Sequence, residues 1–188
     1  MYNLPVVSFL DKLSGEKIKA LQKELSLITG SLYSMHAWQP HLTVGSQIYV
    51  DEKQLDDVSR KFFIIASDTR KITIQTSGFG FYETWPGGVL PDHSPYVAYV
   101  KLEKPKELDI LSQKIKQVTD MCETSYDQPW PYEPHITLAY KDLTREGLER
   151  SIDYLQNKKI SIQIIIDHFL LVQKTDNKWQ ELRRFPFR

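Results

Sequence analysis

One tetrapeptide pattern occurs twice in this chain, at a separation of half the chain length. Pro40-His41-Leu42-Thr43 and Pro134-His135-Ile136-Thr137 lie 94 positions apart in a chain of 188 residues, and an aliphatic residue follows each of them. Chance predicts fewer than one His-x-Thr sequence in a chain of this composition. The duplication therefore predicts a fold of two similar lobes rather than an array of many short repeats.

The predicted secondary structure repeats together with the motifs. Each half should contain a strand, a helix, a short strand that carries the motif, a helix and a long strand. The first-half elements are expected at residues 4–10, 14–28, 40–44, from Asp51 onward, and 72–81; the second-half elements are expected at 96–102, 106–121, 135–139, 144–156 and 160–172, with a last strand at 179–187. Ser14, Asp51 and Thr144 are the predicted helix caps.

This order predicts a single bilobal domain over residues 1–188. Its expected class is α+β. Two pseudo-symmetric lobes, each an antiparallel-rich sheet with outer helices, should face a central cleft.

The spacing within each motif places the His and the Thr on one face of a strand, because side chains alternate between faces with period two. The aliphatic neighbours then point the other way and can anchor each strand in the core: Leu42 and Val44 in the first motif, Ile136 and Leu138 in the second. If the lobes face each other, two imidazoles and two hydroxyls converge on one pocket.

Such a pocket suits phosphodiester chemistry at neutral pH, where an imidazole is near half-protonation. A neutral His can take a proton from water or a ribose hydroxyl, and a protonated His can deliver one to the departing oxygen. We therefore predict His41 and His135 as the acid and base, and Thr43 and Thr137 as donors to the phosphate oxygens. No metal and no cofactor are needed, and the symmetry leaves open which His is the base.

With these motifs the chain resembles the two-histidine (2H) phosphoesterase superfamily, which includes the RNA 2′,3′-cyclic phosphodiesterases often called 2′-5′ RNA ligases. The superfamily hallmark is two His-x-Thr/Ser motifs in pseudo-symmetric lobes, met here by His41 with Thr43 and by His135 with Thr137. The resemblance implies metal-independent opening of a 2′,3′-cyclic phosphate in an RNA end or nucleotide, or cleavage or ligation of a 2′-5′ linkage.

Two other interpretations remain open at this point. A protein of the same shape could bind a nucleotide or RNA end without turnover, and a structural protein could use both histidines as hydrogen-bonded core residues. The intact duplication favours the enzyme, because binding alone does not require an acid and a base together.

An aromatic segment with several prolines precedes the second motif and is a candidate substrate-binding loop. Its rings could stack a nucleobase or could pack on the core: Tyr126, Trp130 and Tyr132. Lys141 could reach a phosphate, and the alternative is a solvated lysine after a strand. The loop at residues 85–91 is long for a hairpin connection, which is typical of functional loops as well as of exposed connectors.

Composition narrows the partners and the compartment. Lys and Arg total 24 and Asp and Glu total 24, so no global field favours a long nucleic-acid duplex. A nucleotide or an RNA end needs only local contacts. The single cysteine, Cys122, excludes an intrachain disulfide, and no apolar stretch reaches the roughly 18 residues of a membrane span. We expect a soluble, cytoplasmic monomer without a membrane partner.

Overall fold

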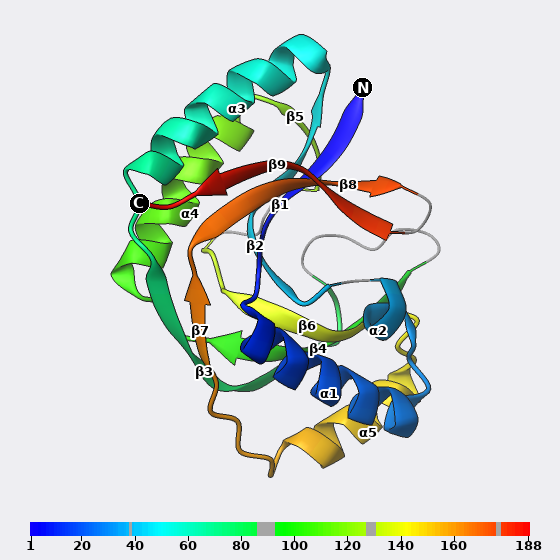
Figure 1. The fold of residues 1–188 in the computed structure, drawn as a ribbon. Helices are drawn as coiled ribbons and strands as arrows, with labels where there is room; N and C mark the ends of the chain where they lie inside the picture. The colour runs from blue at the N-terminus through cyan, green and yellow to red at the C-terminus, as the bar shows by residue number, and fades with distance from the viewer. Residues whose placement is uncertain (38, 86–92, 127–130, 176–177) are drawn as a thin grey trace.

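The computed structural model describes the chain except for residues 38, 86–92, 127–130 and 176–177, and except for the side chains of residues 37, 125, 126, 174 and 178. Its described strands form two antiparallel sheets (Figure 1). We name them by the strand that carries each motif. The β2 sheet has the order β5-β2-β1-β8-β9, and the β6 sheet has the order β6-β4-β3-β7. The predicted α+β class is confirmed.

Both sheets draw strands from both halves of the chain. The β2 sheet contains β1 (Tyr2–Phe9), β2 (His41–Val50), β5 (Glu123–Tyr126), β8 (His168–Thr175) and β9 (Lys178–Pro186). The β6 sheet contains β3 (Ile72–Tyr82), β4 (Ser94–Leu102), β6 (His135–Lys141) and β7 (Gln163–Ile166). The sheets therefore do not coincide with the two halves of the sequence.

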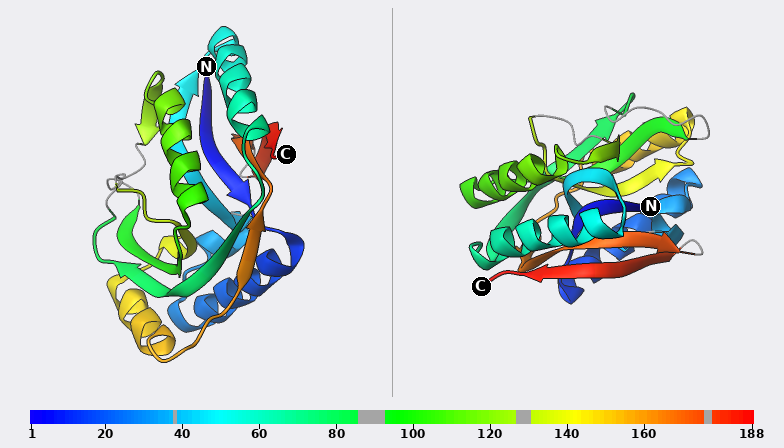
Figure 2. Two further views of the ribbon diagram at one scale, coloured as in Figure 1. Left: turned by 90° about the vertical axis from the view of Figure 1, so that its left-hand side faces the viewer. Right: turned by 90° about the horizontal axis from the view of Figure 1, so that it is seen from above.

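Two pairs of helices cover the two sheets, and each pair takes one helix from each half of the chain (Figures 1 and 2). The described helices are α1 (Lys12–Thr29), α2 (Tyr33–Ala37), α3 (Glu52–Ser67), α4 (Lys106–Thr119) and α5 (Arg145–Leu155). α3 and α4 contact each other and the β2 sheet, whereas α1 and α5 contact each other and the β6 sheet. β2 and β6 also contact each other, so the two motif strands meet where the sheets approach.

Local capping sets the helix boundaries. Asp51 caps α3 in a capping box, because its carboxylate accepts from the Gln54 N–H while the Gln54 side chain accepts from the Asp51 N–H. Thr144 caps α5 as predicted. The predicted start of α1 at Ser14 was wrong. Asp11 is the N-cap, and its carboxylate accepts a hydrogen bond from the Ser14 N–H.

Some strands also differ from the predictions. The apolar run at 160–172 was expected to form one strand, but the chain breaks at Asp167 into β7 and β8, which belong to different sheets. Both strands are rich in apolar residues, so the pattern alone does not show the break. β2 continues to Val50 instead of ending at Val44, and β5 and α2 were not predicted.

The core joins the helices to the sheets through large buried side chains. Phe62 of α3 packs edge to face against Phe169 of β8 and Phe185 of β9, with ring centroids 5.3 and 5.5 Å away.

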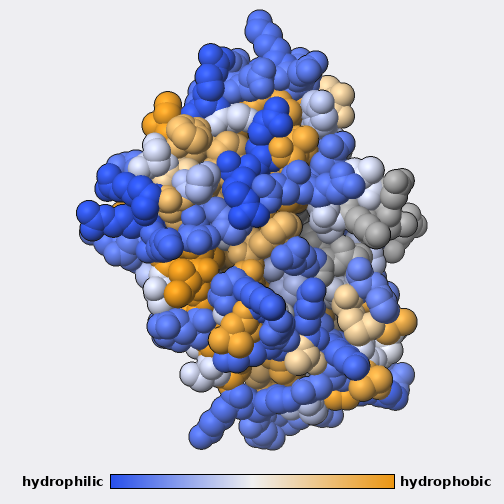
Figure 3. All heavy atoms as spheres, viewed as in Figure 1, coloured by the Kyte–Doolittle hydropathy of each residue, from blue (hydrophilic) through white to orange (hydrophobic). Residues whose placement is uncertain are grey.

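The face of the molecule that carries α1, β8 and β9 is mainly hydrophilic with scattered apolar patches (Figure 3). Over the described part of the chain, no helix has both the length and the apolar character that crossing a membrane requires.

Candidate active site

The two His-x-Thr motifs occupy equivalent places at the starts of β2 and β6. The His and Thr side chains of both motifs are partly exposed, whereas their aliphatic neighbours are buried: Leu42, Val44, Ile136 and Leu138. The predicted alternation is therefore confirmed. His41 and His135 also lie close enough for the charge of His135 to lower the pKa of His41.

Each catalytic candidate ring is held by the backbone two residues before it. The Nδ1 of His41 is 2.8 Å from the carbonyl oxygen of Gln39, and the Nδ1 of His135 is 2.9 Å from the carbonyl oxygen of Glu133. A carbonyl oxygen can only accept, so Nδ1 must carry the proton in both rings. In the neutral tautomer Nε2 is then the basic atom, and in the imidazolium it is a proton donor.

Burial lowers the pKa of both histidines. The pKa of His41 falls to about 4 through burial and, to a smaller extent, the charge of His135, while the hydrogen bond to the Gln39 carbonyl opposes the shift. Burial also lowers the pKa of His135, but there both the hydrogen bond to the Glu133 backbone and the Glu133 carboxylate oppose it. A bound phosphate would favour the charged form of either ring.

The lowered pKa of His41 predicts a pH dependence of stability. Between about pH 4 and its ordinary pKa of 6.5, the unfolded chain binds more protons at His41 than the folded protein does. This contribution therefore destabilises the fold at low pH, weakens as the pH rises, and vanishes above pH 6.5. We therefore expect the unfolding free energy of the wild type to rise by about 1–3 kcal/mol more across this window than that of His41→Gln. Chemical denaturation of both proteins at several pH values measures this difference. The expectation is contradicted if the two unfolding free energies differ by the same amount at every pH.

Two buried side chains brace the motif strands across the molecule. The Tyr132 hydroxyl donates to the backbone carbonyl of Thr43 at 2.9 Å, and the Gln22 side-chain amide donates to the backbone carbonyl of Thr137 at 3.0 Å. Tyr132 is 1% exposed and Gln22 is 3% exposed. Each Thr is thus fixed by a residue from the other half of the chain.

The position of Tyr132 decides between the two interpretations of its ring. A ring that is 1% exposed offers no face to a nucleobase, so Tyr132 is a core residue and not a stacking platform. Tyr126 ends β5, where its backbone pairs with Gln47, but its side chain lies outside the described residues. Trp130 also lies outside them. Stacking by these two rings stays a prediction.

Lys141 ends β6 with a φ of 69°, in the left-handed region. Its ammonium lies 4.6 Å from the centroid of the Tyr33 ring, a cation–π contact that ties β6 to α2. Contact with a phosphate stays a prediction for this side chain.

An aromatic wall beside His135 was not recognised from the sequence. The His135 ring lies 5.1 Å from Tyr99, 5.6 Å from Trp85 and 6.3 Å from Tyr82, measured between centroids, and Tyr82 stacks on Tyr99. Gly80 pairs with Tyr99, and a Cβ at Gly80 would come within 2.3 Å of the Tyr99 ring. The absence of a side chain at Gly80 therefore leaves room for the Tyr99 ring to lie across β3. A glycine within a strand rich in aromatic residues was the sequence feature that could have indicated this close approach.

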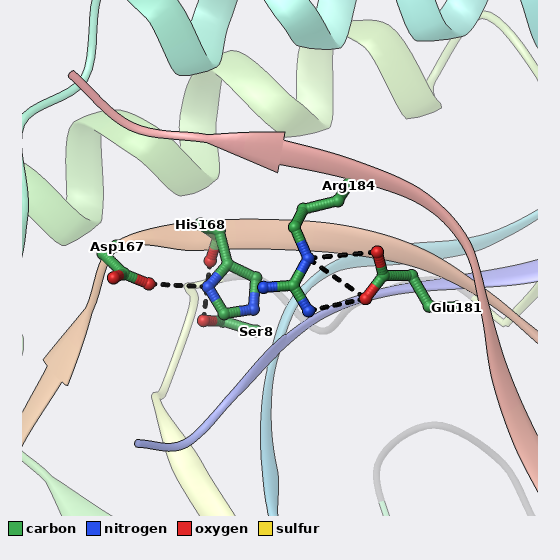
Figure 4. A network of polar contacts seen from close by, with 5 residues as sticks. All are labelled: Ser8, Asp167, His168, Glu181 and Arg184. Carbon is green, nitrogen blue, oxygen red and sulfur yellow. Dashed lines mark hydrogen bonds and ion pairs between the residues drawn. The ribbon is translucent and has the colours of Figure 1, made fainter. Parts of the chain in front are cut away.

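His168 belongs to a separate polar network on β8 and β9 (Figure 4). Its Nδ1 lies 2.6 Å from the Asp167 carboxylate, and the Ser8 hydroxyl donates to its backbone carbonyl. Beside it Arg184 is paired with Glu181. His168 lies two strands away from β2 in the β2 sheet, and the acid–base pair does not include it.

The sequence matches one known protein family and a named relative. The sequence matches the family described as the 2′-5′ RNA ligase superfamily over residues 11–178. A protein of Bacillus mycoides (strain KBAB4) named "Putative phosphoesterase" is 24% identical over 176 residues, which cover 93% of this chain and 90% of that protein.

Solved structures show the same fold. A crystal structure of a protein from Thermus thermophilus has a TM-score of 0.67 at 18% identity, covering 99% of this chain and 98% of that chain. LigT of E. coli complexed with 3′-AMP has a TM-score of 0.64 at 16% identity, with coverage of 99% and 98%. Since the family match spans most of its length, this chain belongs to the 2′-5′ RNA ligase superfamily of two-histidine phosphoesterases.

Proposed function

We propose that this protein is a phosphodiesterase that opens the 2′,3′-cyclic phosphate of an RNA end or a nucleotide. The observation that carries the proposal is the matched anchoring of two neighbouring imidazoles, each with Nδ1 donating to a backbone carbonyl. This anchoring makes Nε2 the reactive atom of both rings. One ring can then act as base while the other acts as acid.

The reaction needs two proton transfers and one displacement at phosphorus. Water attacks the phosphorus atom while a neutral His takes its proton at Nε2. The bond between phosphorus and one ribose oxygen breaks, and the other His delivers its Nε2 proton to that oxygen. The products are a phosphomonoester and a free ribose hydroxyl. A 5′-hydroxyl in place of water would give a 2′-5′ linkage instead.

Thr43 and Thr137 stabilise the charge that builds on the non-bridging oxygens. Each lies two positions after its His on the same face of its strand, so both hydroxyls can donate to one phosphate. The side chains that brace the two Thr carbonyls, Tyr132 and Gln22, hold these strands in place. No step requires a metal ion.

Two further facts support a nucleotide-sized substrate. LigT of E. coli, which has a similar fold, has been crystallised with 3′-AMP and with NADP+. The formal charge of this chain is zero, which favours local contacts with a small substrate over binding to a long duplex. The alternative is a binding module of the same fold. It would account for a pocket at this place, but binding alone does not require an acid and a base together.

The test is hydrolysis of 2′,3′-cyclic nucleotides and of short RNAs ending in a cyclic phosphate, in the presence of a chelator. We expect conversion to phosphomonoesters, which phosphorus NMR can monitor, and a bell-shaped dependence of kcat/KM on pH. Binding of these compounds without any conversion would favour the binding module. Complete dependence on added metal would reject the metal-independent mechanism.

A further inference from the structure

A bulge in β6 turns Tyr140 toward the face of the β6 sheet that carries the second motif. Tyr99 of β4 pairs with Thr137. Its neighbour Ala98 pairs with Ala139, so β6 has one more residue than β4 between the two pairs. Paired residues lie on the same face of a sheet, and an extra residue reverses the alternation along its strand. Tyr140 therefore shares a face with Thr137, although regular alternation would place it on the opposite face.

Aromatic rings extend along this face, away from the second motif. Trp85 lies 5.6 Å from His135 and 5.9 Å from Tyr140, measured between ring centroids. His93 lies 6.0 Å from Tyr140. Burial and, to a smaller extent, the nearby phenol of Tyr33 raise the pKa of Tyr140, so this phenol stays neutral. All these rings are partly exposed, and a single strand of nucleic acid can stack its bases on such a row.

Lys141 ends the row with a positive charge. Its ammonium lies 4.6 Å from the centroid of the Tyr33 ring. A matching contact lies at the end of α5, where the Lys158 ammonium is 4.5 Å from the Tyr154 ring, but Lys158 is also paired with the Glu24 carboxylate. Among the residues that the structure describes, no carboxylate pairs with Lys141. An anion from a ligand can take this place.

Asp142 holds the helix that carries Tyr33. Its carboxylate accepts hydrogen bonds from the Ser31 hydroxyl at 2.5 Å and from the backbone N–H groups of Leu32 and Tyr33 at 2.7 and 2.9 Å. These three donors direct the negative charge of Asp142 toward the start of α2, which lies beside β6 (Figure 1). Lys141 has a φ of 69°, and a residue with a side chain keeps this conformation only where its surroundings impose it. The lysine and the tyrosine are therefore held in fixed positions.

The row is longer than one nucleotide. Lys141 follows His135 by six positions along β6, which corresponds to about 15–20 Å of strand. A mononucleotide at His135 cannot also place a phosphate at Lys141. An RNA of a few nucleotides can, because its backbone carries one phosphate per nucleotide. Its cyclic phosphate is at the 3′ end, so the segment that reaches Lys141 lies on the 5′ side of the reacting group.

We propose that Tyr140 and Lys141 form a binding site for the RNA segment on the 5′ side of the reacting end. Tyr140 stacks a base of this segment, and the ammonium of Lys141, held on the Tyr33 ring, binds one of its phosphates. The inference rests on the proposed function and names a short single-stranded RNA as the substrate that this chain binds best. A duplex does not fit the site, because its bases are not free to stack on protein side chains.

Binding of a phosphorylated RNA end tests this site without any turnover. We expect a single-stranded RNA of about six nucleotides with a 3′-phosphate to bind at least about tenfold tighter than the matching nucleoside 3′-monophosphate, measured by isothermal titration calorimetry. Tyr140→Leu should weaken the binding of the RNA about 5- to 150-fold more than that of the mononucleotide. Equal Kd values for both ligands in the wild type, or equal losses on both in Tyr140→Leu, would overturn the proposal.

The salt dependence of RNA binding tests the phosphate contact of Lys141. Lys141→Met should reduce the steepness of log Kd against log salt concentration by about 0.7, the contribution of one phosphate on a single strand, and Lys141→Arg should retain the wild-type slope. Lys158→Met is the matched control, since it removes a cation from the equivalent contact with Tyr154 and should keep the wild-type slope. An unchanged slope in Lys141→Met, or an equal reduction in Lys158→Met, would exclude this contact.

Turnover assays separate this proposal from the proposed function. Hydrolysis of 2′,3′-cyclic nucleotides by a protein that binds RNA no better than a mononucleotide would keep the phosphodiesterase and reject the RNA site. Tight binding of the RNA that depends on Tyr140 and Lys141, without hydrolysis of any cyclic phosphate, would keep the RNA site and reject the phosphodiesterase.

Discussion

Replacing either His41 or His135 by Ala should lower kcat/KM for a 2′,3′-cyclic nucleotide by about 10² to 10⁴-fold, because each ring carries one of the two proton transfers. Replacing both should cost far less than the product of the single losses, since neither ring completes the reaction without the other. Initial rates of the three variants under one set of conditions give the comparison.

Two further kinds of variant test the phosphate donors and provide a control. Thr43→Val and Thr137→Val keep the shape of the side chain but remove one donor to the phosphate each, which should cost about 10² to 10³-fold in kcat. His168→Asn removes an imidazole that lies two strands from β2 and should leave kcat near the wild-type value. Full activity in either single His variant would reject the paired mechanism.

The sequence predicted the parts of this site that depend on local geometry. Strand alternation alone placed His41 on the same face as Thr43 and His135 on the same face as Thr137, because that rule needs no knowledge of the rest of the chain. The caps Asp51 and Thr144 were found for the same reason.

Features that depend on distant contacts were missed. The brace from Gln22 to Thr137 joins residues 115 positions apart, and no local pattern marks a glutamine in α1 as the partner of β6. Tyr132 was equally compatible with stacking and burial until its hydroxyl was found on the Thr43 carbonyl.

Tyr132→Ala should destabilise the protein by about 3–5 kcal/mol, the range for removing a large buried ring from a core. Tyr132 is among the largest fully buried side chains, and its ring lies in the main core cluster. Tyr132→Phe keeps the ring and removes only the hydrogen bond to Thr43, which should cost about 1–3 kcal/mol because the carbonyl loses its buried donor. Chemical denaturation of both variants measures these differences.

The hydroxyl of Tyr132 should also matter for catalysis, because the carbonyl that it holds belongs to a residue of the first motif. At temperatures where Tyr132→Phe remains folded, we expect kcat/KM to fall by about tenfold as Thr43 loses its fixed position. Phe62→Ala provides the matched control, since it removes a fully buried ring from α3 that packs against β8 and β9. That variant should lose several kcal/mol of stability, about 3–5, while the folded fraction keeps its activity. Equal activity in Tyr132→Phe and the wild type would mean that the core alone positions Thr43.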